Sequence, residues 1–142
     1  MASLFPVECP IPAQKRVPFL DDIPILGRDY SGSFSAKMEI RNLPGDTGTA
    51  LVTLTNQTAG TEGISVTYDA SYDVELRDGS ILTAPASILL FQINETTLEA
   101  LSLGTPYDEP LTLHYDLHVT ATGFRKHVVC FGKFILYPGA TI

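Results

Sequence analysis

The sequence predicts an all-β fold, an antiparallel two-sheet β-sandwich of Ig-like or Greek-key type with one short helix and an extended N-terminal arm. Three observations predict it. Short runs of alternating apolar and polar residues recur along the chain, Gly and Pro separate these runs, and a single stretch has helical spacing. With 142 residues, the chain is long enough for one domain that buries a core without metals or disulfides.

The first 24 residues are predicted to form a proline-rich extended arm, and residues 25–142 the sandwich. Five of the ten prolines fall in this arm, which disfavours helix and leaves few backbone donors for a sheet. The arm is also rich in apolar residues, so we expect it to lie on its own domain or on a neighbouring subunit. The residues expected to form that interface are Phe5, Val7, Ile11, Val17, Phe19 and Leu20.

Strands follow one another through the first two thirds of the sandwich. A short edge strand is expected at residues 23–26, and strict alternation over 33–41 predicts a half-buried strand that pairs antiparallel with 49–55. Further strands are expected at 64–68, 72–77, 81–83 and 87–93. The Asp78-Gly79 dipeptide predicts a tight hairpin turn between two of them.

The stretch with helical spacing follows the last of these strands. Asn94 is a good N-cap residue, Leu98 and Leu101 share one side of a helix over residues 97–103, and Gly104 ends it. We expect one or two turns.

The clearest hairpin spans residues 111–137. Apolar and polar residues alternate along its first strand, which predicts one buried and one solvent-facing side. The apolar residues are Leu111, Leu113, Tyr115, Leu117 and Val119. Thr122-Gly123 supplies the turn, and residues 127–137 form the apolar return strand. Gly132 inside that strand indicates a bulge or a close approach of another backbone.

Three of these strands carry motifs that resemble a phage family. The motifs are Met38, Ile40 and Arg41 at the end of one strand, then Tyr115-Asp116-Leu117, then Gly132, Phe134 and Leu136 followed by Pro138 and Thr141. Over roughly residues 25–142, this combination resembles the N-terminal domain of siphophage baseplate upper proteins and related phage tail-tip and fibre-anchoring modules. The resemblance implies a β-sandwich that anchors receptor-binding or fibre proteins to the tail and oligomerises around its axis.

Two departures from that family refine the expectation. Typical members continue into a helical linker and a second domain, whereas this sequence ends at Ile142, and it has the proline-rich arm in front. We therefore expect a stand-alone baseplate or adaptor subunit, made in the host cytoplasm and located in the virion. Its expected partners are copies of itself, as a ring or trimer, and other tail proteins.

The charge distribution argues against nucleic acid as a partner. The net charge is −7, and residues 42–124 hold eleven acidic side chains and one basic one, Arg77. Phosphate backbones require a basic surface, and the short cluster of Arg125, Lys126 and Lys133 is more typical of solvated turns. The N-terminus does not resemble a secretory signal, and no apolar run is long enough for a membrane span.

One constellation could bind a metal. His114, Asp116 and His118 lie two apart on one strand and share a face, so two imidazoles and a carboxylate could hold Zn²⁺ if a neighbouring strand supplied another ligand. We interpret the three as a solvated polar face and expect neither a metal nor another cofactor. Cys9 and Cys130 are expected to be free thiols.

No catalytic residues are expected. The chain has no Gly-x-Ser-x-Gly elbow and no catalytic cysteine signature, and the carboxylates Asp73, Glu75 and Asp78 fit an exposed strand face. The alternative function is a carbohydrate-binding module for host-surface recognition. Tyr30, Tyr72 and Tyr107 are the aromatic residues that could stack on sugar rings.

Overall fold

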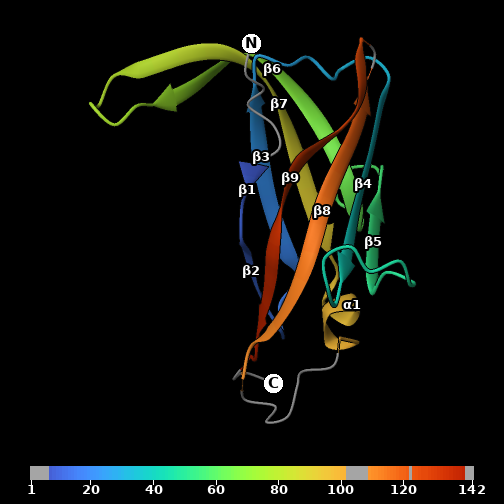
Figure 1. Cartoon of the computed structure of the whole chain (residues 1–142). Helices are drawn as coiled ribbons and strands as arrows, with labels where there is room; N and C mark the ends of the chain where they lie inside the picture. Colours follow the sequence, from blue (N-terminus) through green and yellow to red (C-terminus); the bar gives the residue numbers. More distant parts are fainter. Residues whose placement is uncertain (1–6, 102–108, 122, 140–142) are drawn as a thin grey trace.

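The protein is a sandwich of two β-sheets, seen here in a computed structural model that describes residues 7–101, 109–121 and 123–139 (Figure 1). The larger sheet has six strands in the order β1-β9-β8-β4-β5, with β2 also paired to β9, and the smaller has the order β3-β7-β6. The strands are β1 (Val7–Glu8), β2 (Ile11–Gln14), β3 (Phe19–Leu26), β4 (Phe34–Arg41), β5 (Val52–Thr55), β6 (Gly63–Glu75), β7 (Ile81–Ile93), β8 (Leu111–Ala121) and β9 (Phe124–Tyr137). The predicted two-sheet sandwich is confirmed.

The core lies between the two sheets. Alternation along β4 and β8 buries one side chain in two, as predicted, and Ile40, Leu113 and Leu117 are completely buried. From the opposite sheet, Leu89 and Ile93 of β7 close the core. The predicted antiparallel pairs β4–β5 and β8–β9 are present.

The arm is part of the sandwich, which corrects the predicted division at residue 24. Strands β1 and β2 run parallel to β9 along its outer edge, and the predicted boundary falls inside β3. Ile11 and Ala13 are 4% and 6% exposed. Proline is tolerated here because β2 is an edge strand, and such a strand needs hydrogen bonds on only one side. The parallel pairing of the arm also departs from the predicted all-antiparallel arrangement.

Strands β6 and β7 are each longer than the sequence indicated. Residues 64–68 and 72–77 were expected as two strands, but they belong to one strand with a bulge between Asp69 and Tyr72. Residues 81–83 and 87–93 likewise form a single strand that passes through Pro85. Pro85 falls opposite the bulge, where the ladder is interrupted, so its missing N–H breaks no pair.

The predicted short helix is α1 (Glu95–Glu99), two residues earlier than expected. Asn94 occupies the N-cap position, but its Oδ1 accepts a hydrogen bond from Gln92. Instead, Glu62 Oε2 accepts from the Asn94 backbone N–H at 2.6 Å and from the Thr97 hydroxyl at 2.7 Å. A carboxylate near a helix start is favourable, so this contact ties the helix to β6. Gly104 lies outside the described residues.

Buried polar groups are satisfied by a small network under β9. The Ser87 hydroxyl donates to the Arg28 carbonyl and accepts from the Tyr30 backbone N–H. His127 Nδ1 donates to the Arg125 carbonyl at 2.7 Å, and its Nε2 lies 3.1 Å from the Tyr30 hydroxyl oxygen. Across the described ranges, none of the helices has the length and apolarity needed to span a bilayer.

Candidate functional site

The most prominent surface feature is a hairpin that leaves the body of the sandwich (Figure 1). We call residues 71–84, the outer halves of β6 and β7 with the turn between them, the projecting hairpin. Its turn follows the prediction, with Gly79 at φ 86° and the Leu76 carbonyl accepting from the Gly79 N–H at 2.9 Å. Asp78 Oδ1 also accepts from the Ser80 N–H and hydroxyl. These bonds make the turn well defined.

The projecting hairpin has two chemically different faces. Tyr72 lies opposite Ala84 and Val74 opposite Leu82, so one face is apolar. The other face carries the pairs Asp73–Thr83 and Glu75–Ile81. Leu82 is 45% exposed, although cross-strand apolar pairs are normally covered.

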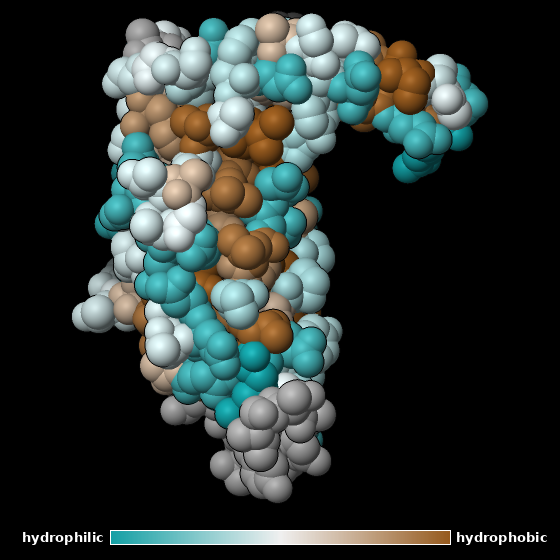
Figure 2. Space-filling model, turned by 180° about the vertical axis from the view of Figure 1, so that it is seen from behind, coloured by the Kyte–Doolittle hydropathy of each residue, from teal (hydrophilic) through white to brown (hydrophobic). Residues whose placement is uncertain are grey.

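A second apolar surface lies on the outer side of the three-stranded sheet. Register places five apolar residues on that side of β3 and β7, and we call them the apolar band: Leu20, Pro24, Leu26, Ile88 and Leu90. Figure 2 shows a hydrophobic band running along this side of the body, with further apolar residues on the projecting hairpin. Leu20 is 59% exposed.

The six residues predicted as an interface separate into three groups. Ile11 and Phe19 are buried in the core of their own chain, and the Phe19 ring meets Phe134 edge-on at 5.9 Å between centroids, so assigning them to an interface was wrong. Val7, Val17 and Leu20 are exposed, and Leu20 belongs to the apolar band. Phe5 lies outside the described residues.

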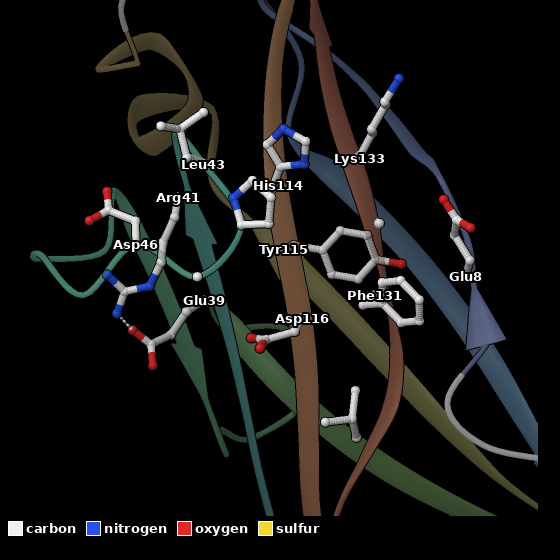
Figure 3. A pocket seen from close by; sticks show the side chains of 14 residues that line it. Glu8, Glu39, Arg41, Leu43, Asp46, His114, Tyr115, Asp116, Phe131 and Lys133 are labelled. Carbon is white, nitrogen blue, oxygen red and sulfur yellow. Dashed lines mark hydrogen bonds and ion pairs between the residues drawn. The ribbon is translucent and has the colours of Figure 1, made fainter. Parts of the chain in front are cut away.

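The outer face of the six-stranded sheet holds a groove with a volume of about 680 Å³ (Figure 3). Its floor consists of β4, β8 and β9, and one wall is the loop around Leu43 and Asp46. Register arranges the floor in two rows: Arg41, His114 and Lys133 lie side by side across the three strands. The next row contains Glu39, Asp116 and Phe131, with Glu8 beyond it on β1.

Ion pairs neutralise part of the charge in the groove. Glu39 Oε2 accepts from Arg41 at 2.5 Å, and Lys37 lies 3.4 Å from Glu39 Oε1. Burial alone would raise the pKa of Glu39, but the hydrogen bond from Lys37 and the charge of Arg41 outweigh burial and lower it. Glu39 is therefore ionised at neutral pH.

The residues considered as possible metal ligands are only partly brought together. His118 Nε2 lies 3.0 Å from Asp116 Oδ2, whereas His114 is placed in the groove between Arg41 and Lys133. Within the described part of the chain, three or more His, Cys, Asp or Glu side chains do not converge in a way that could hold a metal ion. Cations lie beside both histidines, and the carboxylate beside Asp116, that of Glu39, is already paired with Lys37 and Arg41.

Both cysteines are free thiols, and both lie near Tyr115. Burial raises the pKa of Cys130 to about 11, so its thiol stays protonated at neutral pH. The Tyr115 hydroxyl donates to the Cys9 carbonyl at 2.5 Å, and burial raises the pKa of this phenol. The Tyr115 hydroxyl therefore connects the arm to β8.

The other candidates from the sequence are dispersed. Tyr30 is 1% exposed and cannot stack on a sugar, Tyr72 lies on the projecting hairpin, and Tyr107 is outside the described residues. Asp73 accepts from the Thr83 hydroxyl, and Asp78 stabilises the turn. Lys133 lies in the groove, whereas Arg125 and Lys126 are at the far end of β9.

Comparison of the sequence with protein-family models and with curated proteins found no match.

Sequence reasoning located neither the groove nor the projection of the hairpin. Alternation placed Glu39 and Arg41 on a solvent-facing side, but only strand register shows that they border Asp116 and Phe131. The Asp78-Gly79 turn predicted the hairpin, and nothing in its sequence indicated that the body of the sandwich ends before it.

Proposed function

We propose that this chain is a virion structural protein, a subunit of a phage tail tip or baseplate that assembles by protein–protein contacts. The observation that carries the proposal is the projecting hairpin, which extends beyond the body of the sandwich and leaves Leu82 of its apolar face 45% exposed. The proposal includes no catalytic activity.

The hairpin is unusual because it extends beyond the core that stabilises it. A two-stranded ribbon alone is marginally stable in water, so it needs a partner surface to hold a fixed position. Its apolar pairs Tyr72–Ala84 and Val74–Leu82 provide what such a partner would bury. The acidic residues Asp73 and Glu75 lie on the opposite face and would remain in water.

A second copy of the chain is the partner that fits best. The apolar band belongs to the same sheet and can receive the apolar face of a hairpin from a neighbour, and register also places Asp22 on this side, opposite Leu90. Hairpin and band are different surfaces, so the contact is head-to-tail. Such contacts close into rings when the rotation between subunits permits. A ring or trimer around the tail axis is the assembly that follows.

The phage setting is supported by the sequence motifs. Most of the residues that resemble baseplate upper proteins lie on β4, β8 and β9, with Ile40, Tyr115 and Gly132 in register with one another; Thr141 is outside the described residues. Their adjacency in one sheet is consistent with a shared fold signature. In this setting the other partners would be tail proteins, and the protein would reside in the virion.

The oligomer contact is tested by one pair of matched variants. Leu82→Ser removes a side chain from the apolar face of the projecting hairpin, and Ile81→Ser removes a more exposed one from the opposite face. We expect Leu82→Ser to weaken self-association by at least about tenfold, measured by light scattering over a concentration series, and Ile81→Ser to leave it unchanged. A monomeric parent protein, or equal effects of the two variants, would contradict the proposal.

The virion assignment has a separate test. Antibody labelling of purified phage particles in electron micrographs should place the protein at the tail tip. Labelling elsewhere, or its presence only in cell extract, would refute the phage role even if the oligomer forms.

The alternative, a carbohydrate-binding module, is favoured by one specific observation. The groove on the six-stranded sheet combines a partly exposed aromatic ring with polar side chains. Recognition of sugars on the host surface would be its role.

A further inference from the structure

We infer that the groove on the outer face of the six-stranded sheet is a binding site for a neutral, hydroxyl-rich ligand, namely an uncharged oligosaccharide. This inference does not depend on self-assembly. The groove is lined by the six-stranded sheet, whereas the projecting hairpin and the apolar band belong to the three-stranded one.

The spacing of donors and acceptors is the first argument. Neighbouring strands lie about 5 Å apart, and rows of side chains on one face are about 7 Å apart along a strand. The floor therefore presents donors from Arg41, His114 and Lys133 beside acceptors from Glu39 and Asp116 at a spacing comparable with a pyranose ring. Hydroxyl groups both donate and accept hydrogen bonds, so a sugar can satisfy both rows at once.

The charge balance selects a neutral ligand. The lining contains four carboxylates, those of Glu8, Glu39, Asp46 and Asp116, and two permanent cations, those of Arg41 and Lys133. A polyanion would be repelled by the excess of carboxylates. A strongly cationic ligand would have to compete with the groups that already engage three of these carboxylates: Arg41 and Lys37 at Glu39, the Gly48 N–H at Asp46, and His118 at Asp116. Neutral hydroxyl groups do not have to displace the groups that already engage the carboxylates, and they can still form charge-assisted hydrogen bonds with the charged side chains.

Phe131 provides the apolar platform. Its ring is 39% exposed on the groove side of β9, beside Asp116, and labelled side chains of both strands face the same space (Figure 3). Sugars have an apolar face of C–H groups that packs on aromatic rings while their hydroxyls reach polar side chains. Leu43 on the opposite wall adds apolar contact. The volume of about 680 Å³ is within the usual range of small-ligand sites, about 300–1,000 Å³.

The site is tested with the full-length protein and defined probes. Maltohexaose, isomaltotriose and triacetylchitotriose serve as neutral oligosaccharides, and a heparin hexasaccharide as the anionic one. We expect at least one neutral probe to shift amide resonances of residues 114–116 and 131–133 in NMR titrations up to about 10 mM, a concentration that detects weak sites. Failure of all three neutral probes, or tighter binding of the heparin hexasaccharide, would overturn the inference.

Four variants separate the contribution of the aromatic ring from that of the polar row, with one control on the other sheet. Phe131→Ser should weaken binding of the neutral probe by at least about tenfold, and Phe131→Tyr, which keeps the aromatic face, should retain it. Asp116→Asn, which preserves shape and loses the charge-assisted acceptor, should weaken binding about three- to tenfold. Ile81→Ser on the projecting hairpin should bind like the parent protein.

Two further measurements distinguish loss of sugar binding from loss of folding and from loss of self-association. Melting temperatures identify a variant that has merely lost stability, and the Phe131→Tyr protein shows whether the aromatic ring itself matters. Light scattering on the same variants should show unchanged self-association. If Phe131→Ser binds the sugar as well as the parent protein does, the groove is not the site; if it only loses assembly, the groove is instead a contact between copies.

Discussion

Gly132 is the residue on which the position of the arm depends most directly. It has φ of 148°, and a Cβ atom there would lie 3.0 Å from the Cys9 carbonyl oxygen and 3.4 Å from the Cys9 nitrogen. The predicted close approach of another backbone is confirmed. Because the side chain is missing, Tyr115 on β8 can reach across β9 and donate to the Cys9 carbonyl.

Gly132→Ala should therefore loosen the arm. The new methyl group forces the Cys9 backbone to move and places alanine at a φ that L-residues rarely adopt, so we expect a loss of about 1–3 kcal/mol in the free energy of unfolding. Urea unfolding followed by circular dichroism measures it. Gly27→Ala is the matched control, since Gly27 also has a positive φ, 74°, but a Cβ there meets nothing within 4 Å. If both proteins lose the same free energy of unfolding, backbone strain alone explains the loss and the contact with Cys9 does not contribute.

At the scale of elements, the arm behaves as two edge strands of the sandwich. It is held by the ladder to β9, by the Tyr115 hydroxyl and by its last turn, where Arg16 lies 3.1 Å from Glu99 of α1. An exposed ion pair of this kind contributes little, so the buried side chains decide the stability of the arm.

Ile11→Ala should destabilise the whole domain. Ile11 is 4% exposed, and removing its side chain leaves a cavity between β2 and the core that costs about 2–5 kcal/mol. Val7→Ala, at a position in the same arm that is 47% exposed, should change stability by no more than about 0.5 kcal/mol. Thermal unfolding of the two proteins tests this. A melting temperature of Ile11→Ala equal to that of the parent protein would mean that the arm does not contribute to the stability of the sandwich.

At the scale of the whole molecule, stability is distributed unevenly. The sandwich has a continuous core contributed by both sheets, whereas the projecting hairpin is a two-stranded extension of one sheet. The two parts therefore differ in the free energy needed to open them locally.

Hydrogen exchange should reveal that difference. In dilute monomer, we expect amides of residues 71–84 to exchange at least about a hundredfold faster than those of β8, because their opening breaks few buried contacts. When the protein is concentrated enough to assemble, the same amides should become protected while β8 stays unchanged. Core-like protection of the hairpin in the monomer would mean that it needs no partner, and would remove the main support for the assembly proposal.

The sequence by itself determined the class of fold and much of its detail. Four features depend on interactions between near neighbours or on strong backbone preferences, so one amino-acid sequence is enough to predict them. They are the alternation in β4 and β8, the Asp78-Gly79 turn, the start of the helix at Asn94 and the special role of Gly132. The free thiols of Cys9 and Cys130 were also predicted correctly.

Tertiary structure alone decided which segments meet. Three features depend on partners far away along the chain: the parallel pairing of the arm with β9, the burial of Ile11 and Phe19, and the continuity of β7 through Pro85. The groove arises in the same way, because strand register sets Arg41, His114 and Lys133 side by side. Alternation tells which face a side chain takes, but the free energy of pairing two distant strands is a property of both strands together, and no local pattern encodes it.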